Sequence, residues 1–122
     1  MSVSIGLSHE LVGYLGAHNP PEHPVLRRCR AETAAMGDIS RMQISAEQGA
    51  LMQLLAKLVH ARTAIEIGVF TGYSSLAVAL AMQSLHGDSA KLYALDVNAD
   101  YTARAKDYWA AAGVSNIIDL RI

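Results

Sequence analysis

The pattern of hydrophobic and polar positions predicts alternating strands and helices in the second part of the chain. Short apolar runs at Ala64–Ile67, Lys91–Asp96 and Asn116–Ile122 are typical of strands, and we expect the first to be buried. Between them, Ser74–Leu85 and Asp100–Ala112 have helical periodicity. A β-α-β-α-β order favours parallel strands with right-handed crossovers, so the fold class is α/β, with half of a doubly wound, Rossmann-like sheet.

The first part of the chain is predicted to be helical. Helices are expected over Ser8–His18, over Glu22–Met36 and from a cap at Ser45 to about His60. The last of these has one apolar stripe, formed by Leu51, Leu54, Leu55, Leu58 and Val59. We therefore divide the chain into an N-terminal helical segment, 1–40, and a Rossmann-like domain, 41–122.

Composition excludes several classes of protein. The 122 residues are 52% hydrophobic and 17% charged, with a net charge of −1, so no basic field favours nucleic acid. The Arg27, Arg28 and Arg30 cluster is read as a solvated helix face. No apolar run reaches the roughly 18 residues of a membrane span. The single cysteine, Cys29, is read as a packed thiol and favours a reducing, cytoplasmic location.

The junction after the first predicted strand suggests a ligand site. Gly68 and Gly72 allow a tight turn before a helix, where backbone amides attract anionic groups and Ser74 adds a hydroxyl. Glu66 would repel a pyrophosphate and suits a cationic group, while Asp96 ends the next strand, where an acid can accept ribose hydroxyls. An acid, a glycine turn, a hydroxyl and a second acid together suggest a zwitterionic nucleoside such as S-adenosylmethionine.

Four segments at and around these positions resemble one known family. Glu66–Ser74 is similar to the first motif of the cation-dependent O-methyltransferases, the catechol and caffeoyl-coenzyme A type. Met42–Gly49 and Ala94–Asn98 match on either side, as does Tyr108–Val114 further along. The resemblance covers about Arg30–Ile122 and implies a methyltransferase sheet preceded by helices.

The resemblance implies contacts with the methionine end of S-adenosylmethionine. Glu66, Gly68 and Val69 would line that end and the turn. Ser74 would hydrogen-bond the methionine carboxylate.

Four further residues would contact the rest of the cofactor. Asp96 would hold the ribose and Phe70 would flank the cofactor. Met42 and Ile44 would cover it from the preceding loop.

A divalent cation, Mg²⁺, is also implied by the resemblance, but its ligands in the family lie on later strands and loops. The five histidines show no ligand spacing, so we name no metal ligand and no catalytic residue in this chain. We expect a truncated polypeptide that is inactive alone. Because a fourth strand would be missing, Ala64–Ile67 would be an exposed edge, and we expect a homodimer or higher self-association.

The sequence therefore predicts methyl transfer to a hydroxyl of a small, catechol-like or phenolic acceptor. The alternative is a non-catalytic half-domain that binds the cofactor or self-associates. A nicotinamide-dependent oxidoreductase is disfavoured by Glu66 and by the missing third glycine of the dinucleotide fingerprint.

Overall fold

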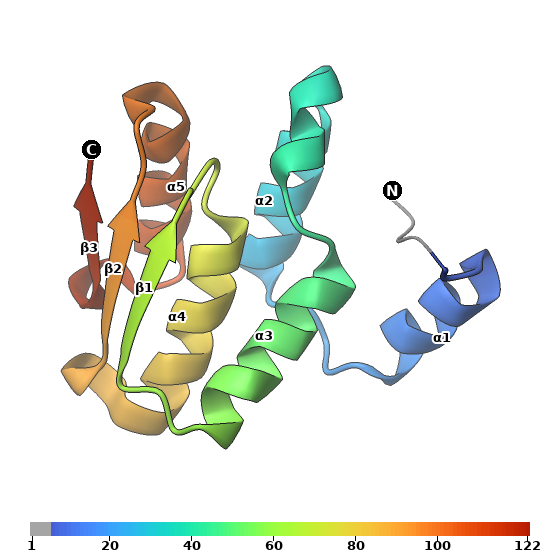
Figure 1. The fold of residues 1–122 in the computed structure, drawn as a ribbon, viewed down its shortest axis with the longest axis horizontal. Helices are drawn as coiled ribbons and strands as arrows, with labels where there is room; N and C mark the ends of the chain where they lie inside the picture. The colour runs from blue at the N-terminus through green and yellow to red at the C-terminus, as the bar shows by residue number, and fades with distance from the viewer. Residues whose placement is uncertain (1–5) are drawn as a thin grey trace.

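The computed structural model describes residues 6–122 and contains a parallel sheet of three strands (Figure 1). The strands are β1 (Thr63–Ile67), β2 (Lys91–Leu95) and β3 (Ile118–Arg121), and they lie side by side in that order. All of β1 pairs with β2, with Thr63 opposite Lys91. The α/β class and the parallel strand order predicted from the sequence are confirmed.

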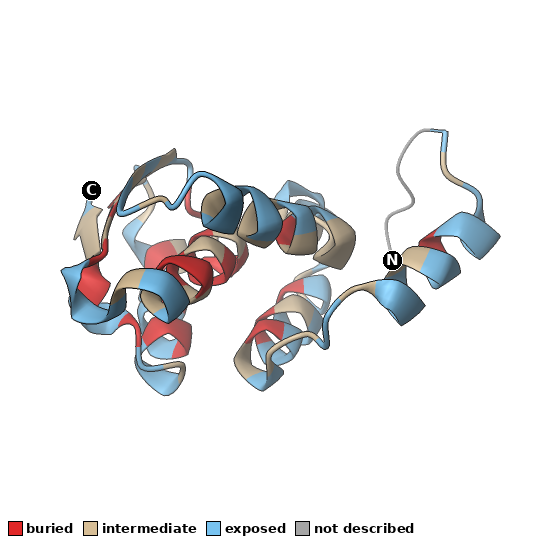
Figure 2. Cartoon of the chain, turned by 90° about the horizontal axis from the view of Figure 1, so that it is seen from below, coloured by how far each residue is buried: buried red, intermediate tan, exposed pale blue. Residues whose placement is uncertain are grey.

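Two helices cover one face of this sheet (Figure 1). They are α4 (Tyr73–His86), between β1 and β2, and α5 (Ala99–Ala111), between β2 and β3. The short 3-10 turns η2 (Gly87–Ser89) and η3 (Ser115–Ile117) lead into β2 and β3. Buried positions concentrate along α4 and the inner side of α5 (Figure 2). The core includes Leu76, Met82, Leu92, Trp109, Val114 and Ile117.

The segments before the sheet are α1 (His9–His18), α2 (Pro24–Ala34), the 3-10 turn η1 (Gly37–Met42) and α3 (Ala46–Leu58). α2 packs on α4 and α5, α3 packs on α4, and α1 contacts α3 and extends away from the sheet (Figure 1). The helix expected to reach Met36 ends at Ala34, and the chain continues as η1.

The apolar stripe of α3 does not face the core. Leu51, Leu54, Leu55, Leu58 and Val59 are each at least 50% exposed. α3 instead turns its smaller residues towards α4, and a Cβ placed on Gly49 would lie only 2.8 Å from Cε1 of Tyr73. Gln53 completes this contact by donating a hydrogen bond of 3.0 Å to the carbonyl oxygen of Ala77 in α4. The leucines therefore form an apolar surface beside the sheet.

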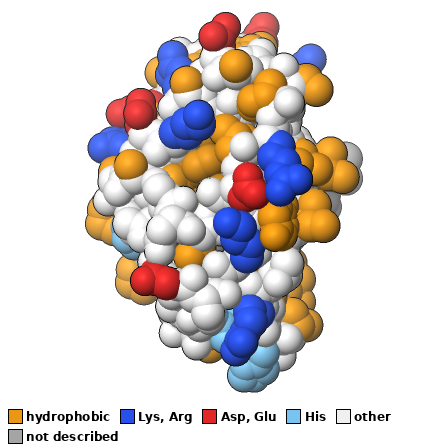
Figure 3. Space-filling model, turned by 90° about the vertical axis from the view of Figure 1, so that its left-hand side faces the viewer, with side chains coloured by type: hydrophobic (Ala, Val, Ile, Leu, Met, Phe, Trp, Pro, Cys, Tyr) orange, Lys and Arg blue, Asp and Glu red, His pale blue; other side chains and the backbone are white. Residues whose placement is uncertain are grey.

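β1 is not buried, contrary to the sequence-based expectation. Ile65 is 69% exposed and Ile67 is 84% exposed. The reason is that, within residues 6–122, helices cover only the opposite face of the sheet and β1 pairs only with β2. From the β3 side, further hydrophobic side chains are visible between lysines and arginines (Figure 3). None of the helices described is long and apolar enough to cross a bilayer.

Candidate functional site

The turn that joins β1 to α4 has an unusual backbone. Gly68 and Gly72 both have φ of 90°, and Phe70 between them has φ of 54°. A positive φ costs a residue with a Cβ about 1–3 kcal/mol, and such residues cluster at functional sites. We call residues 68–72 the glycine turn. Its local hydrogen bond runs from the amide of Gly72 to the carbonyl of Val69, at 3.0 Å.

The two glycines of this turn have different surroundings. A Cβ on Gly72 would lie 2.5 Å from Cβ of Ala105 and 3.2 Å from Nε1 of Trp109, so α5 packs directly against this position. A Cβ on Gly68 would meet no atom within 4 Å. Gly72 is therefore required by packing as well as by its φ, whereas Gly68 leaves open space next to the turn.

Asp96, just after β2, is hydrogen-bonded to the glycine turn. Its Oδ2 accepts the backbone amides of Val69 at 2.7 Å and Phe70 at 2.9 Å. Its Oδ1 accepts those of Val97 at 2.6 Å and Asn98 at 2.9 Å. Partial burial would raise the pKa of this carboxyl, but the four amides favour the charged form and hold the pKa below its ordinary value.

Glu66, the fourth residue of β1, faces the start of α4. Its Oε1 accepts a hydrogen bond from the hydroxyl of Ser74. Its Oε2 is buried and has no hydrogen-bond partner among the described residues. Burial raises the pKa of Glu66, the Ser74 bond opposes that rise, and the negative charge of Asp96 adds to it. The site thus holds a buried acceptor that lacks a donor.

A small cavity of about 90 Å³ lies along this turn. Its lining residues are Met42, Gln43, Ile44, Gly68, Val69, Phe70, Thr71, Tyr73 and Ser74. Six of the eight residues selected from the sequence are in this set. The other two, Glu66 and Asp96, are hydrogen-bonded to members of it. The structure therefore brings all eight together, with Met42 54% exposed at the rim.

Sequence reasoning did not select Gln43, Thr71 and Tyr73 as lining residues. It also missed Tyr101 of α5, whose ring meets the Phe70 ring edge-on with centroids 5.0 Å apart. The adjacency of Thr71 and Tyr73 to the glycines was the only available signal for them. Nothing in the sequence marks Phe70 for a positive φ.

Among residues 6–122, no three histidine, cysteine, aspartate or glutamate side chains are grouped so that they could hold a metal ion. The described part of the chain thus does not assemble a site for the divalent cation that the resemblance implies.

Known methyltransferases share this α/β fold. The family model described as "O-methyltransferase" matches residues 16–122, so the chain belongs to this family. A probable caffeoyl-CoA O-methyltransferase 1 of Dictyostelium discoideum is 47% identical over 81 residues, covering 66% of this chain and 34% of the relative. A catechol O-methyltransferase domain-containing protein 1 of Mus musculus is 35% identical over 109 residues, covering 89% of this chain and 40% of the relative.

Solved structures agree with the family assignment. The O-methyltransferase TomG of Streptomyces achromogenes, in complex with SAM, superposes with a TM-score of 0.79 at 29% identity, covering 91% of this chain and 48% of that one. The SAH-bound methyltransferase PaMTH1 of Podospora anserina has a TM-score of 0.82 at 18% identity, covering 99% and 52%, and supports the fold alone. The chain spans about a third to two fifths of the curated relatives described above.

Proposed function

We propose that this chain binds S-adenosylmethionine at the glycine turn and forms the cofactor side of an O-methyltransferase. The observation on which this rests is Oε2 of Glu66, a buried acceptor with no donor among residues 6–122, beside a turn that leaves open space at Gly68. An amino group of the ligand would supply the missing hydrogen bond. A charged pair there would also offset the cost of burying the carboxylate.

The remaining contacts follow from the cavity. Ser74 would bind the methionine carboxylate at the N-terminus of α4, where helix amides favour anions, with its hydroxyl turning from Glu66 to the ligand. Asp96 would accept the ribose hydroxyls, and Phe70 would flank the cofactor.

Met42 and Ile44 line the same cavity as the glycine turn, although they precede it in the sequence, and would cover the bound cofactor. Both come from the segment around the end of η1, which leads into α3.

When bound, S-adenosylmethionine supplies an electrophilic methyl group on a sulfonium sulfur. The proposed acceptor is a hydroxyl of a small catechol-like or phenolic molecule, as the names of the relatives suggest. The residues of this chain would orient the cofactor. The buried, single Cys29 is the basis for proposing a cytoplasmic location.

Calorimetric titration with S-adenosylhomocysteine, with NAD as the control ligand, tests this proposal. We expect saturable binding of S-adenosylhomocysteine only, and its loss in Glu66→Ala and Asp96→Ala. A folded chain that binds neither ligand contradicts the proposal. Turnover is a separate question, and our expectation of none from this chain alone is tested with catechol and Mg²⁺.

The second candidate function is self-association through β1. Its support is the exposure of Ile65 and Ile67 on a strand that pairs on one side only within residues 6–122. Unpaired strand edges attract other strands, so we propose a homodimer or higher assembly by edge pairing.

A further inference from the structure

Besides lining the cavity, the glycine turn also contacts α2. Thr71, inside the turn, is 1% exposed, and its hydroxyl shares a 2.8 Å hydrogen bond with the hydroxyl of Thr33 in α2. The thiol of Cys29, one helical turn earlier, lies 3.7 Å from the carbonyl oxygen of Thr71 and donates to it. Two buried side chains of one helix therefore contact both the side chain and the backbone of the same turn residue.

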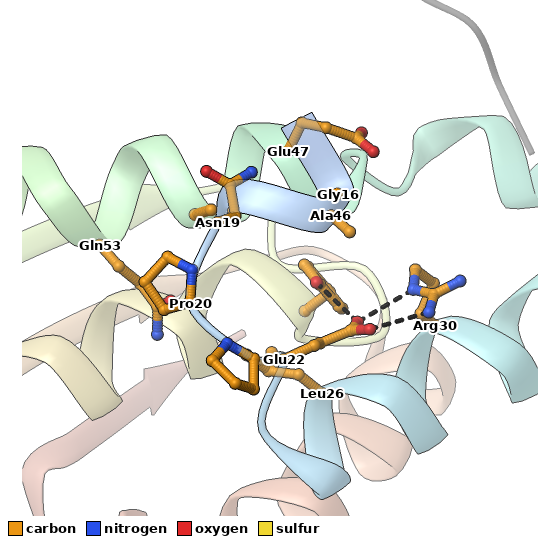
Figure 4. A pocket seen from close by; sticks show the side chains of 13 residues that line it. Gly16, Asn19, Pro20, Glu22, Leu26, Arg30, Ala46, Glu47 and Gln53 are labelled. Atoms are coloured by element: carbon orange, nitrogen blue, oxygen red, sulfur yellow. Dashed lines mark hydrogen bonds and ion pairs between the residues drawn. The ribbon is translucent and has the colours of Figure 1, made fainter. Parts of the chain in front are cut away.

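The residue that follows the turn is held from the same side. Tyr73 is 3% exposed, and its hydroxyl donates a 2.9 Å hydrogen bond to Oε1 of Glu22, in the loop before α2. Arg30 of α2 fixes Glu22 with two further bonds, of 2.9 and 2.8 Å, one to each carboxylate oxygen (Figure 4). Such a two-point arginine–carboxylate pair holds both orientation and position. The hydrogen bonds from Arg30 lower the pKa of Glu22 against the opposing effect of burial, so this carboxylate is ionised at neutral pH.

These contacts matter because the turn is strained. Phe70 has a positive φ between two glycines that also have positive φ, and such backbone persists only when its surroundings hold it. Inside the molecule, α5 restrains Gly72 and Asp96 restrains the amides of Val69 and Phe70. The contacts of Thr71 with α2 and of Tyr73 with Glu22 hold the two residues on either side of Gly72.

We infer that α2 and the loop before it act as a support for the glycine turn, with Thr33 and Glu22 as positioning residues that set its geometry without touching the cofactor. The link to affinity rests on the proposed function, since Thr71 and Tyr73 also line the cavity. Cofactor binding by the Rossmann-like part would then depend on α2, whose Thr33 lies 38 residues before Thr71 in the sequence.

The test compares Thr33→Val, which removes one hydroxyl at nearly constant shape, with Thr33→Ser, which keeps it. Ile117→Val is the matched control, because it removes a methylene from a fully buried residue of η3 that does not line the cavity. Two readouts are needed: amide hydrogen exchange at Gly72 and Val69, and calorimetric affinity for S-adenosylhomocysteine.

We expect Thr33→Val to speed exchange at the turn and to weaken binding, each by about fivefold, as for one hydrogen bond. Thr33→Ser should behave as the wild type. When Thr71→Val is already present, adding Thr33→Val should change exchange and affinity little further, because the hydrogen bond between the two hydroxyls is already lost. Tyr73→Phe provides the same test for the Glu22 contact if Thr33→Val fails to fold.

The outcomes separate the two ideas. If Thr33→Val speeds amide exchange at the turn but the wild type binds no S-adenosylhomocysteine, α2 is upheld as a support and the proposed function is contradicted. Exchange that changes no more than in Ile117→Val overturns the support role, whatever the affinity. Equal affinity of Thr33→Val and wild type, despite faster exchange, overturns the effect on binding.

Discussion

Oδ2 of Asp96 accepts the backbone amide of Val69 at 2.7 Å, which ties the end of β2 to the glycine turn after β1. The same carboxylate also accepts the amides of Phe70, Val97 and Asn98, so its roughly four lone-pair sites are all occupied. A ribose hydroxyl at Asp96 would therefore share or replace one of these bonds. The same residue is thus a structural link in the free protein and the proposed ribose ligand in the complex.

Replacing Asp96 should destabilise the fold in a pH-dependent way. In Asp96→Asn, the amide group cannot accept two of the four backbone bonds, and we expect a loss of about 1–2 kcal/mol at pH 7 for this partly exposed group. Because the folded pKa lies below the ordinary value of 3.8, the contribution is complete above that value and is lost as pH falls through the folded pKa. Urea unfolding at pH 7 and pH 3 measures this, with Asp107→Asn as an exposed control. An equal loss of unfolding free energy in Asp96→Asn at both pH values would contradict a lowered pKa for Asp96.

Replacing Glu66 should have the opposite effect on stability. Burial raises its folded pKa above the ordinary value of 4.5, so its ionisation opposes folding as pH rises through 4.5 towards the folded pKa. Glu66→Gln should therefore be more stable than wild type at pH 7, by on the order of 1 kcal/mol, and similar to it near pH 4. Thermal unfolding checks this against Glu10→Gln on α1.

The same variant should bind S-adenosylhomocysteine more weakly. In the wild type, affinity should increase as pH rises through the raised pKa of Glu66, because the ligand's ammonium requires the ionised carboxylate. This pH dependence should be absent in Glu66→Gln. Calorimetric titrations with S-adenosylhomocysteine across that pH range test this. If the affinity of Glu66→Gln depends on pH as the wild type's does, Glu66 is not the ammonium ligand.

The two glycines of the turn provide a matched pair of substitutions. Both have φ of 90°, but only Gly72 is in close contact with α5. Gly72→Ala should cost about 3 kcal/mol, from backbone strain plus overpacking against Ala105. Gly68→Ala should cost about 1 kcal/mol and yet reduce S-adenosylhomocysteine binding strongly, since its methyl group enters the open space. Denaturation and calorimetry on both variants separate these effects, and equal stability losses would contradict the geometry.

Self-association through β1 can be tested on the exposed strand itself. Ile67→Lys places a charge on the bare face of β1 and should shift light scattering at high concentration towards the monomer. Val97→Lys is the control, because Val97 is 95% exposed but lies outside the strands. A wild type that is strictly monomeric at high concentration would remove the proposal.

The sequence predicted the strands and the glycine turn well because both depend on local signals. Short β-branched runs, glycines and a capping serine each report on their immediate backbone, so the strands, the turn and the cap at Ser45 were located within about two residues. The eight residues proposed to contact the cofactor came from the family resemblance, and the structure places them around the glycine turn.

What the sequence did not reveal depends on which surfaces meet. The leucine stripe of α3 has the pattern of a buried face, but α4 packs against Gly49 and Gln53 instead. Likewise, the pattern of β1 cannot show that one face and one edge stay exposed. The contact between Thr33 and Thr71, 38 residues apart, has no local signature at all.

The parallel sheet also has a consequence for the order of folding. Since Thr63 pairs with Lys91 and Leu92 with Ile118, no ladder bond can form before a loop of more than twenty residues has closed. The glycine turn lies inside the first of these loops. Asp96 reaches the amides of Val69 and Phe70 only when β1 lies beside β2, so a variant that slows closure of this loop would also delay the contacts that hold the glycine turn.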